Sequence, residues 1–282
     1  MSSPPHQYVI GVGSQRCGTT LLFHLLSSMQ GIFMHPLKEL HYFDSLQRPP
    51  GNSFRALQKR GAERRLASMR PWRGHFRGRY WRNTNELLAN KEQHEYAYSD
   101  LFRYIPGRSA NRFLGEITPA YMLLTDSSLM KMRREVGNAR IILIERDPLQ
   151  RVISAFKLHI TRSVGRESRS FSDAELDRRF LELLETRGTW VDLQRAFNQY
   201  ADAAARYRKH FDHVLVMDHT IFKDQAACVS RLEEFLGTRA NRDQVSRHLK
   251  VKYNSHKRGY RPSNEVIEVL QDRFMLSGVD ML

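Results

Sequence analysis

Cysteine is scarce in this sequence: Cys17 and Cys228 are the only two among 282 residues. One lies in a glycine-containing turn and the other in a predicted helix, so neither a disulfide framework nor a cysteine-ligated metal site is expected. No apolar run approaches the ~18 residues that a membrane-spanning helix needs, and segment 1–7 lacks the charged-then-apolar pattern of a secretory signal. We therefore expect a cytoplasmic protein without a transmembrane segment.

Acidic residues are also in deficit, since 30 Asp and Glu face 45 Lys and Arg and leave a formal net charge of +15. Such an excess favours anionic partners, which include nucleic acid, acidic lipid, polyanionic glycan and nucleotides with several phosphates. The net charge alone does not distinguish among these classes of partner. With 41% hydrophobic residues, the chain is long enough to bury a core, and we expect a single domain over residues 1–282.

Four segments have the apolar, β-rich pattern of buried strands, and helical patterns follow them. The predicted strands are 8–14, 112–116, 139–145 and 213–217. Helices are predicted over 19–29, from Pro148, and up to Leu236, where Gly237 ends the helix. Such alternation requires right-handed crossovers, so the predicted class is α/β: a P-loop-type parallel sheet with helices on both faces. Two polar, mostly helical stretches, 54–91 and 171–208, are predicted to be insertions around the sheet.

A glycine-containing turn follows the first predicted strand. Gly13, four intervening residues and then Gly18-Thr19-Thr20 have the spacing of a P-loop, in which backbone N–H groups surround phosphate oxygens at a helix N-terminus. The lysine that a kinase or NTPase needs directly after the second glycine is absent, because Thr19 stands there and the nearest cation is Arg16. The loop therefore predicts phosphate binding without ATP hydrolysis. Taken alone, it also fits a tight turn that merely enters a helix.

A second candidate anion site follows the strand predicted at 139–145. Arg146-Asp147-Pro148 ends that strand, and Ser154 lies two turns into the next helix. Ligands of open α/β sheets bind at the carboxyl ends of the strands, although an Arg-Asp-Pro turn alone also fits a helix N-terminus with a salt bridge. Two anion sites at the ends of two parallel strands fit a ligand with phosphate at both ends.

Both segments resemble the donor site of sulfotransferases that use 3'-phosphoadenosine-5'-phosphosulfate (PAPS). The resemblance implies that the phosphosulfate is bound by Arg16, Cys17, Gly18, Thr19 and Thr20. It also implies that the 3'-phosphate is bound by Arg146 and Ser154. A basic glycine loop closes over that phosphate in this family, formed here by Lys257, Arg258 and Gly259. The family forms 3',5'-adenosine bisphosphate as product and requires no metal, and the resemblance covers nearly the whole chain outside the two insertions.

Segment 38–44, Lys-Glu-Leu-His-Tyr-Phe-Asp, resembles the Lys-Glu-x-His-Phe-Phe segment of the heparan sulfate (glycosaminoglycan) branch of this family. The glutamate is the general base in that branch, which assigns proton removal to Glu39 and charge stabilisation at the leaving bridge to Arg16. If the segment is extended, positions two apart face the same way, so Glu39 and His41 could converge on one acceptor with either as the base. A solvated carboxylate beside a structural histidine is the alternative interpretation.

The segment that lies at the acceptor side in that branch differs at one position in this sequence. Gly-Glu-Ile-Thr-Pro-Ala-Tyr at 115–121 resembles its Gly-Glu-Lys-Thr-Pro-Ala-Tyr segment, but Ile117 replaces the lysine. The change predicts an acceptor other than a sulfated glycosaminoglycan: a small molecule, lipid or carbohydrate with a hydroxyl or amine. Composition suggests a soluble bacterial member of the family. The acceptor's identity and the oligomeric state are left open.

The stretch 60–82 holds eight arginines, with four aromatic residues interleaved: Trp72, Phe76, Tyr80 and Trp81. It fits a solvated helical face, a basic acceptor mouth, or a surface that binds nucleic acid through phosphate contacts and stacking. Two rival functions stay open at this point. A P-loop kinase would need magnesium and a lysine after Gly18, and a basic nucleic-acid-binding protein would carry a recognised binding motif, which we do not find. We therefore expect no nucleic-acid partner.

Overall fold

The computed structural model of the chain describes residues 7–45, 53–69, 76–105, 110–186, 189–251, 253 and 259–275. Five parallel strands form one sheet in the order β2-β3-β1-β4-β5. Their bounds are Gln7–Gly13 (β1), Ile32–Met34 (β2), Phe113–Ile117 (β3), Arg140–Glu145 (β4) and His213–Asp218 (β5). The predicted parallel sheet is thereby confirmed.

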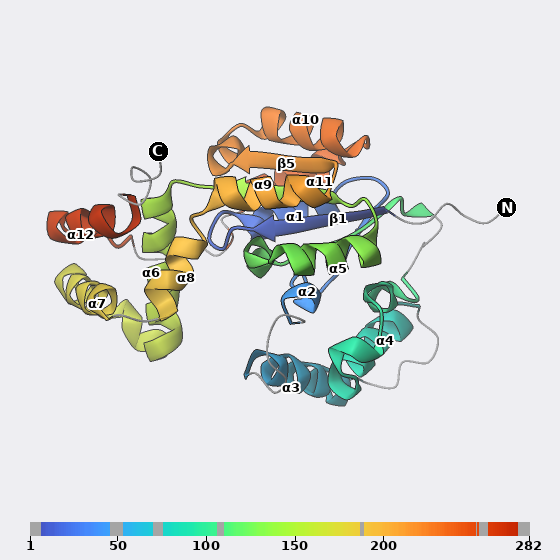
Figure 1. Cartoon of the computed structure of the whole chain (residues 1–282), viewed down its shortest axis with the longest axis horizontal. Helices are drawn as coiled ribbons and strands as arrows, with labels where there is room; N and C mark the ends of the chain where they lie inside the picture. The colour runs from blue at the N-terminus through green and yellow to red at the C-terminus, as the bar shows by residue number, and fades with distance from the viewer. Residues whose placement is uncertain are drawn as a thin grey trace.

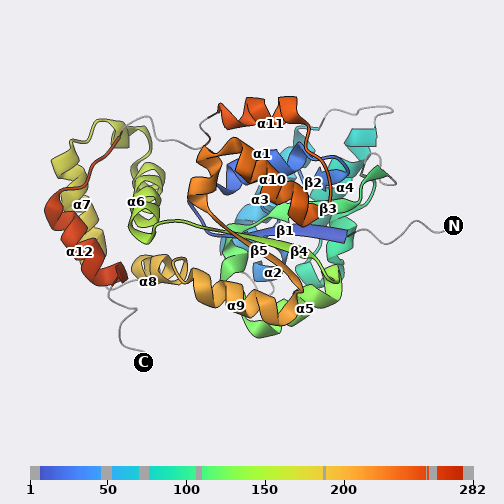
Figure 2. The same cartoon turned by 90° about the horizontal axis from the view of Figure 1, so that it is seen from above.

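Helices cover both faces of this sheet (Figure 2). One face carries α1 (Thr19–Ser27), α10 (Gln225–Leu236) and α11 (Arg242–Leu249). The other carries α5 (Asp126–Val136) and α9 (Tyr200–His210). The α/β class predicted from the sequence is therefore confirmed. None of the described helices is long and apolar enough to cross a membrane.

Burial explains why these segments form strands. The run Ile-Ile-Leu-Ile at 141–144 is at most 1% exposed, because a central parallel strand is covered on both faces and needs apolar residues at consecutive positions. Four strands agree with their predicted segments to within one residue at each end. The sequence did not predict β2, since three residues are too few for a strand pattern. It takes its place by pairing with β3 at the edge of the sheet.

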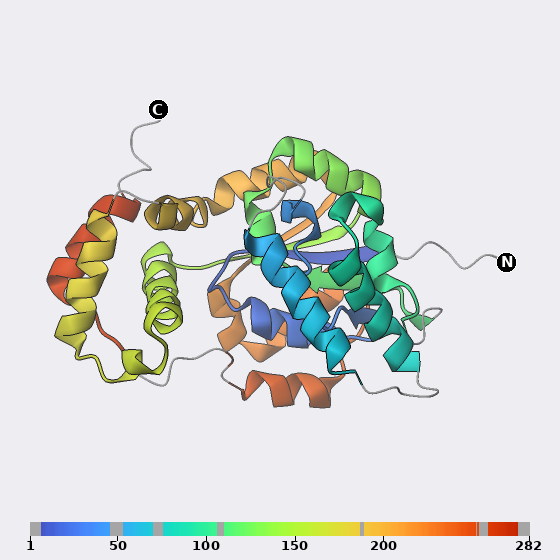
Figure 3. The same cartoon turned by 90° about the horizontal axis from the view of Figure 1, so that it is seen from below.

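The two predicted insertions are helical where the structure describes them. The first contains α3 (Ser53–Ala67) and α4 (Phe76–Asn90), which pack side by side beneath the sheet (Figure 3). The second contains α7 (Asp173–Glu185), α8 (Thr189–Ala196) and part of α9. Within the arginine-rich stretch, Tyr80 is buried, whereas the arginines 60, 64, 79 and 82 are exposed. Trp72 lies outside the described residues.

A second hydrophobic cluster lies beside the sheet. α6 (Pro148–Val164) leaves the end of β4 and shares this cluster with α7 and α12 (Asn264–Met275), at the left of Figure 1. Phe156 and Phe180 stack there with ring centroids 3.9 Å apart. Arg151, fully buried on α6, donates hydrogen bonds to Gln194 and Asn198. These contacts join α6 to α8 and the residue stretch that follows it.

Short helical turns make up further parts of the described residues. They are α2 (Tyr42–Ser45) and the 3-10 turns Gln93–Glu95, Tyr98–Phe102, Pro119–Leu123, Gly165–Arg169 and His219–Lys223. Three of them directly follow strands or strand-end loops: Tyr42–Ser45 after β2, Pro119–Leu123 after β3 and His219–Lys223 after β5. The residues at the carboxyl edge of the sheet are thus held in short, defined turns.

Candidate active site

A cleft of about 780 Å³ opens along the carboxyl ends of the strands. Nine of the predicted site residues line it: Arg16, Gly18, Thr19, Thr20, Glu39, His41, Arg146, Ser154 and Gly259. Cys17 does not, because its side chain is fully buried with the sulfur 3.7 Å from the Tyr200 hydroxyl. Lys257 and Arg258 lie outside the described residues. The fold thus brings most of the predicted site into one cavity.

Loop 13–18, the predicted phosphate site, ends in a left-handed glycine. Gly18 has φ 88° and ψ 16° and directly precedes α1. A Cβ at this position would lie 2.7 Å from the Phe222 ring, so both the backbone conformation and the close approach favour glycine. Thr19 and Thr20, in the first turn of α1, line the cleft. The positive end of the helix dipole and two hydroxyl residues therefore border the cavity, as an anion site requires.

Arg16 connects the two predicted anion sites. Its Nε donates to Ser154 Oγ at 2.9 Å, and Arg146 Nη1 donates to the Arg16 carbonyl oxygen at 2.8 Å. Arg16 has φ 71°, in the left-handed region that non-glycine residues rarely occupy. Burial, and then the nearby charges of Arg146 and Arg162, lower its pKa. This crowding of like charges is unfavourable until an anion binds among them.

The Glu39 carboxylate lies between two cations. Lys38 Nζ donates to its Oε1 at 2.6 Å, and His41 Nε2 lies 3.5 Å from its Oε2. The other ring nitrogen of His41, Nδ1, lies 2.9 Å from Asp44 Oδ2. Glu39 and His41 lie close together, but the segment is not extended, the condition under which the sequence placed them on one side. Lys38 (φ 60°) and His41 (φ 51°) are left-handed, so a turn brings the side chains together.

These ion pairs set the protonation states of the two candidate bases. Burial alone would raise the pKa of Glu39, but its bonds to His41 and Lys38 outweigh burial and lower that pKa to about 2. Burial alone would lower the pKa of His41, whereas its bonds to Asp44 and Glu39 raise it to about 9. At neutral pH Glu39 is a carboxylate that can accept a proton, and His41 is an imidazolium that cannot.

The profile of the Sulfotransferase family matches residues 8–242. The chain belongs to the sulfotransferase family. A crystal structure of a sulfotransferase from Alicyclobacillus acidocaldarius shares the fold, with a TM-score of 0.58 and 21% identity over 97% of this chain and 93% of that chain.

Two further solved structures are similar to the present chain. One is a sulfotransferase domain from the curacin biosynthetic pathway, with a TM-score of 0.49 and 13% identity over 96% of this chain and 98% of that chain. The other is a retinol dehydratase in complex with androsterone and inactive cofactor PAP, with a TM-score of 0.41 and 14% identity over 99% and 84%. Comparison with curated protein sequences gives no match. The family predicted from the phosphate loops is confirmed, and the heparan sulfate branch stays a prediction.

A buried carboxylate supports the turn that carries the candidate base. Glu116 on β3 is fully buried and accepts a hydrogen bond from the Leu40 N–H at 2.8 Å. It also accepts from three hydroxyls, those of Tyr98, Thr118 and Tyr121. Burial raises its pKa to about 7 in spite of these bonds. Because Leu40 lies between Glu39 and His41, Glu116 fixes the backbone from which both side chains project.

Sequence reasoning missed several residues that line the cleft: Lys157, Arg162, His219, Phe222 and Lys223. Lys157 follows Ser154 by three positions and so lies on the same face of α6, a spacing that could have identified it. His219 and Lys223 come from the turn after β5, whose place in the cleft follows only from the strand order. Burial, and then the nearby Arg146, lower the pKa of both Lys157 and His219.

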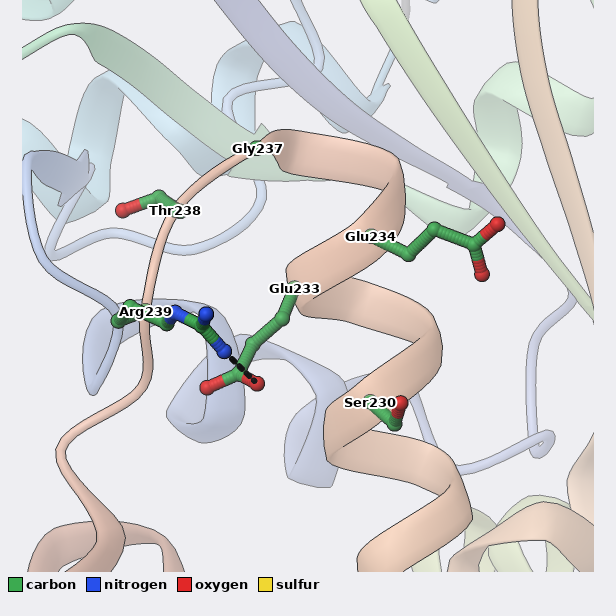
Figure 4. A pocket seen from close by; sticks show the side chains of 6 residues that line it. All are labelled: Ser230, Glu233, Glu234, Gly237, Thr238 and Arg239. Carbon is green, nitrogen blue, oxygen red and sulfur yellow. Dashed lines mark ion pairs between the residues drawn. The ribbon is translucent and has the colours of Figure 1, made fainter.

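A second pocket, of about 450 Å³, lies at the carboxyl end of α10 (Figure 4). α10 runs back from the carboxyl edge of the sheet, so this pocket is at the opposite edge from the cleft. Its Glu233 carboxylate is bound by Arg242 at 2.9 Å, by Arg239 at 3.6 Å and by the Ala240 N–H at 2.9 Å. These bonds neutralise the carboxylate within the fold and hold the chain reversal after Gly237. We assign this pocket a structural role.

The pair of His41 and Asp44 should make stability depend on pH. The pKa of His41 is about 9, above its ordinary value of 6.5. The pair's contribution is therefore fully present below pH 6.5 and is lost as the pH rises through 9. We expect Asp44→Asn to lower the free energy of unfolding, with a difference from wild type that is largest at about pH 6 and shrinks toward about pH 9. Urea unfolding of both proteins measures it, and a difference independent of pH would contradict the assignment.

Proposed function

We propose that this sulfotransferase takes its sulfuryl group from PAPS and transfers it to a hydroxyl or amine of a small-molecule, lipid or carbohydrate acceptor. The observation that carries the proposal is the junction of the two anion sites. Arg16 is bonded to Ser154 through its side chain and to Arg146 through its backbone. One ligand with anionic groups at both ends suits such a cleft. PAPS has these groups on the 5' and 3' sides of its ribose and carries about four negative charges.

The proposal assigns the two ends of the donor to the two anion sites. The 5'-phosphosulfate would lie against Arg16 and the first turn of α1, with Gly18, Thr19 and Thr20. The 3'-phosphate would lie against Arg146 and Ser154. Gly259 lines the same cleft and would lie beside the nucleotide. Cys17 would contribute through its backbone, since its side chain is buried, and the roles of Lys257 and Arg258 stay predictions.

The strand order supports an in-line displacement. Glu39 follows β2 and Arg146 follows β4, while the phosphate loop follows β1, which lies between those two strands in the sheet. A sulfuryl group at the phosphate loop would therefore have the proposed base on one side and the nucleotide on the other. In-line transfer needs this arrangement, because the attacking and leaving atoms must approach and depart along one line.

Glu39 is the proposed general base. A bond forms between the acceptor atom and sulfur as the bond from sulfur to the bridging oxygen of PAPS breaks. The electron pair of that bond leaves with 3',5'-adenosine bisphosphate, and the acceptor's proton goes to the Glu39 carboxylate. Arg16 and the N-terminus of α1 would stabilise the charge that develops at the bridging oxygen. His41 acts as a cation that orients Glu39, because its bonds to Asp44 and Glu39 keep it protonated.

Titration calorimetry with 3',5'-adenosine bisphosphate, against ATP with and without magnesium, tests the donor. We expect tight binding of the bisphosphate that does not change with magnesium, and weak binding of ATP. The missing lysine after Gly18 is the reason, since ATP would lack the contact that holds its β and γ phosphates. Preference for ATP with magnesium would overturn the proposal and favour a P-loop kinase.

A further inference from the structure

Lys38 pairs with the proposed base and lines the same cleft as the donor site. We propose that Lys38 is a positioning residue for Glu39, whose ammonium holds the carboxylate while the donor site is empty and moves to the donor's sulfuryl oxygens when PAPS binds. This inference rests on the proposed function and adds to it a link between donor binding and the basicity of Glu39. The link would make Glu39 a competent base only when a sulfuryl group is present.

The backbone of Lys38 is firmly placed. Its N–H donates to the His35 carbonyl at 2.8 Å, and its carbonyl accepts from the Ile117 N–H at 2.9 Å. Lys38 also has φ 60°, a left-handed conformation that costs a non-glycine residue about 1 kcal/mol or more. Such strain is retained where the surrounding structure requires it, which is most often at a functional site. Here the turn places the lysine and Glu39 side by side at the cleft, with only 18% of the lysine side chain exposed.

The two cations on Glu39 differ in what else holds them. His41 is bonded to Asp44 through its second ring nitrogen and to Thr118 through its backbone N–H. The Lys38 ammonium has a single hydrogen-bond partner within the described part of the chain, Glu39 Oε1. An ammonium has three donors on a flexible four-carbon stem, so two remain for solvent or a ligand. Of the two cations, Lys38 is therefore the one that can change partners.

Movement of Lys38 away from Glu39 would make Glu39 a stronger base. With Lys38 and His41 both bonded to it, Glu39 has a pKa of about 2 in spite of burial, and such a carboxylate is a weak base. General-base catalysis is most effective when the pKa lies closer to the working pH. The titratable groups around the pair are His41 and Asp44 from the same turn, Glu116 from β3 and His24 from α1. Loss of the lysine to the donor would leave one cation on Glu39 and increase its basicity.

A carboxylate titration followed by carbon-13 NMR tests the change of partner. The Glu39 signal is identified by its absence in Glu39→Gln, and its shift is followed from about pH 4 to pH 8 in protein alone, with 3',5'-adenosine bisphosphate and with PAPS. Wild-type Glu39 should stay ionised alone and with the bisphosphate, and should start to protonate in this range only with PAPS. In Lys38→Met it should start to protonate within this range before any ligand is added, because one of its two cations is gone. Lys38→Arg, which keeps the charge, should restore the low pKa.

The second readout is the ratio of the affinities for PAPS and the bisphosphate, which differ by the sulfuryl group. Lys38→Met should lower this ratio by roughly tenfold, as for a lost hydrogen bond to a charged group. The control is Lys131→Met, which removes an exposed ammonium on α5 outside the cleft and should leave the ratio and the Glu39 titration unchanged. An equal response of Glu39 to PAPS in wild type and Lys38→Met, with an unchanged ratio, would overturn the inference. Failure of all variants and the wild type to bind the bisphosphate would instead reject the proposed donor.

Discussion

Glu39→Gln should lower turnover by about a hundredfold or more while leaving the affinity for 3',5'-adenosine bisphosphate unchanged. The amide keeps the size of the side chain but cannot take the acceptor's proton. Glu39 follows β2, and its ion-pair partners Lys38 and His41 lie outside the two predicted anion sites. The loss should therefore fall on the chemical step. Transfer of radioactive sulfate from PAPS, with the acceptor that the wild type modifies best in a panel of phenols, sterols, sugars and amines, measures turnover.

His41→Gln is the matched control for this experiment. His41 is held as a cation by Asp44 and Glu39, so its replacement should misplace the base and raise its pKa without removing it. We expect a smaller loss of turnover than for Glu39→Gln. The acid limb of the pH profile should also move to higher pH, because Glu39 would have lost a charge that keeps it ionised. Undiminished turnover in Glu39→Gln together with complete loss in His41→Gln would move the role of base to the histidine.

The strands and the glycine turn before α1 could be predicted because their signals are local. A central parallel strand such as β4 must be apolar at consecutive positions, and a left-handed residue before a helix calls for glycine, as at Gly18. These patterns are legible in a few residues without knowledge of their neighbours. The placement of Arg146 at the end of β4 follows in the same way, since ligands of such sheets bind at that edge.

The turn at 38–41 could not be predicted in the same manner. Its conformation depends on Thr118, which accepts from the His41 N–H, and on Glu116, which accepts from the Leu40 N–H. Both partners lie more than seventy positions away, so no local pattern indicates the left-handed backbone. The sequence placed Glu39 and His41 together only if the segment were extended, whereas in the structure a turn brings them together. The low pKa of Glu39 is likewise a property of the folded turn, since it arises from bonds that form only there.

Arg146→Ala should weaken binding of 3',5'-adenosine bisphosphate by on the order of 2 kcal/mol, or roughly thirtyfold, if this side chain binds the 3'-phosphate. Calorimetry measures the loss. The guanidinium also donates to the Arg16 carbonyl, so its removal could act indirectly through the phosphate loop. Adenosine 5'-monophosphate separates the two effects, because it keeps the 5'-phosphate and lacks the 3'-phosphate.

If Arg146 contacts the 3'-phosphate directly, Arg146→Ala should weaken binding of the bisphosphate strongly and binding of the monophosphate little. Distortion of the phosphate loop predicts equal losses for both nucleotides, which would contradict the assignment of the 3'-phosphate to this arginine. Ser154→Ala provides the comparison, since it removes the partner of Arg16 Nε at the same site without removing a charge. Ser154→Ala should lose less binding affinity than Arg146→Ala, because a hydroxyl contributes a weaker hydrogen bond to phosphate than a guanidinium does. The loss of affinity should again be confined to the bisphosphate.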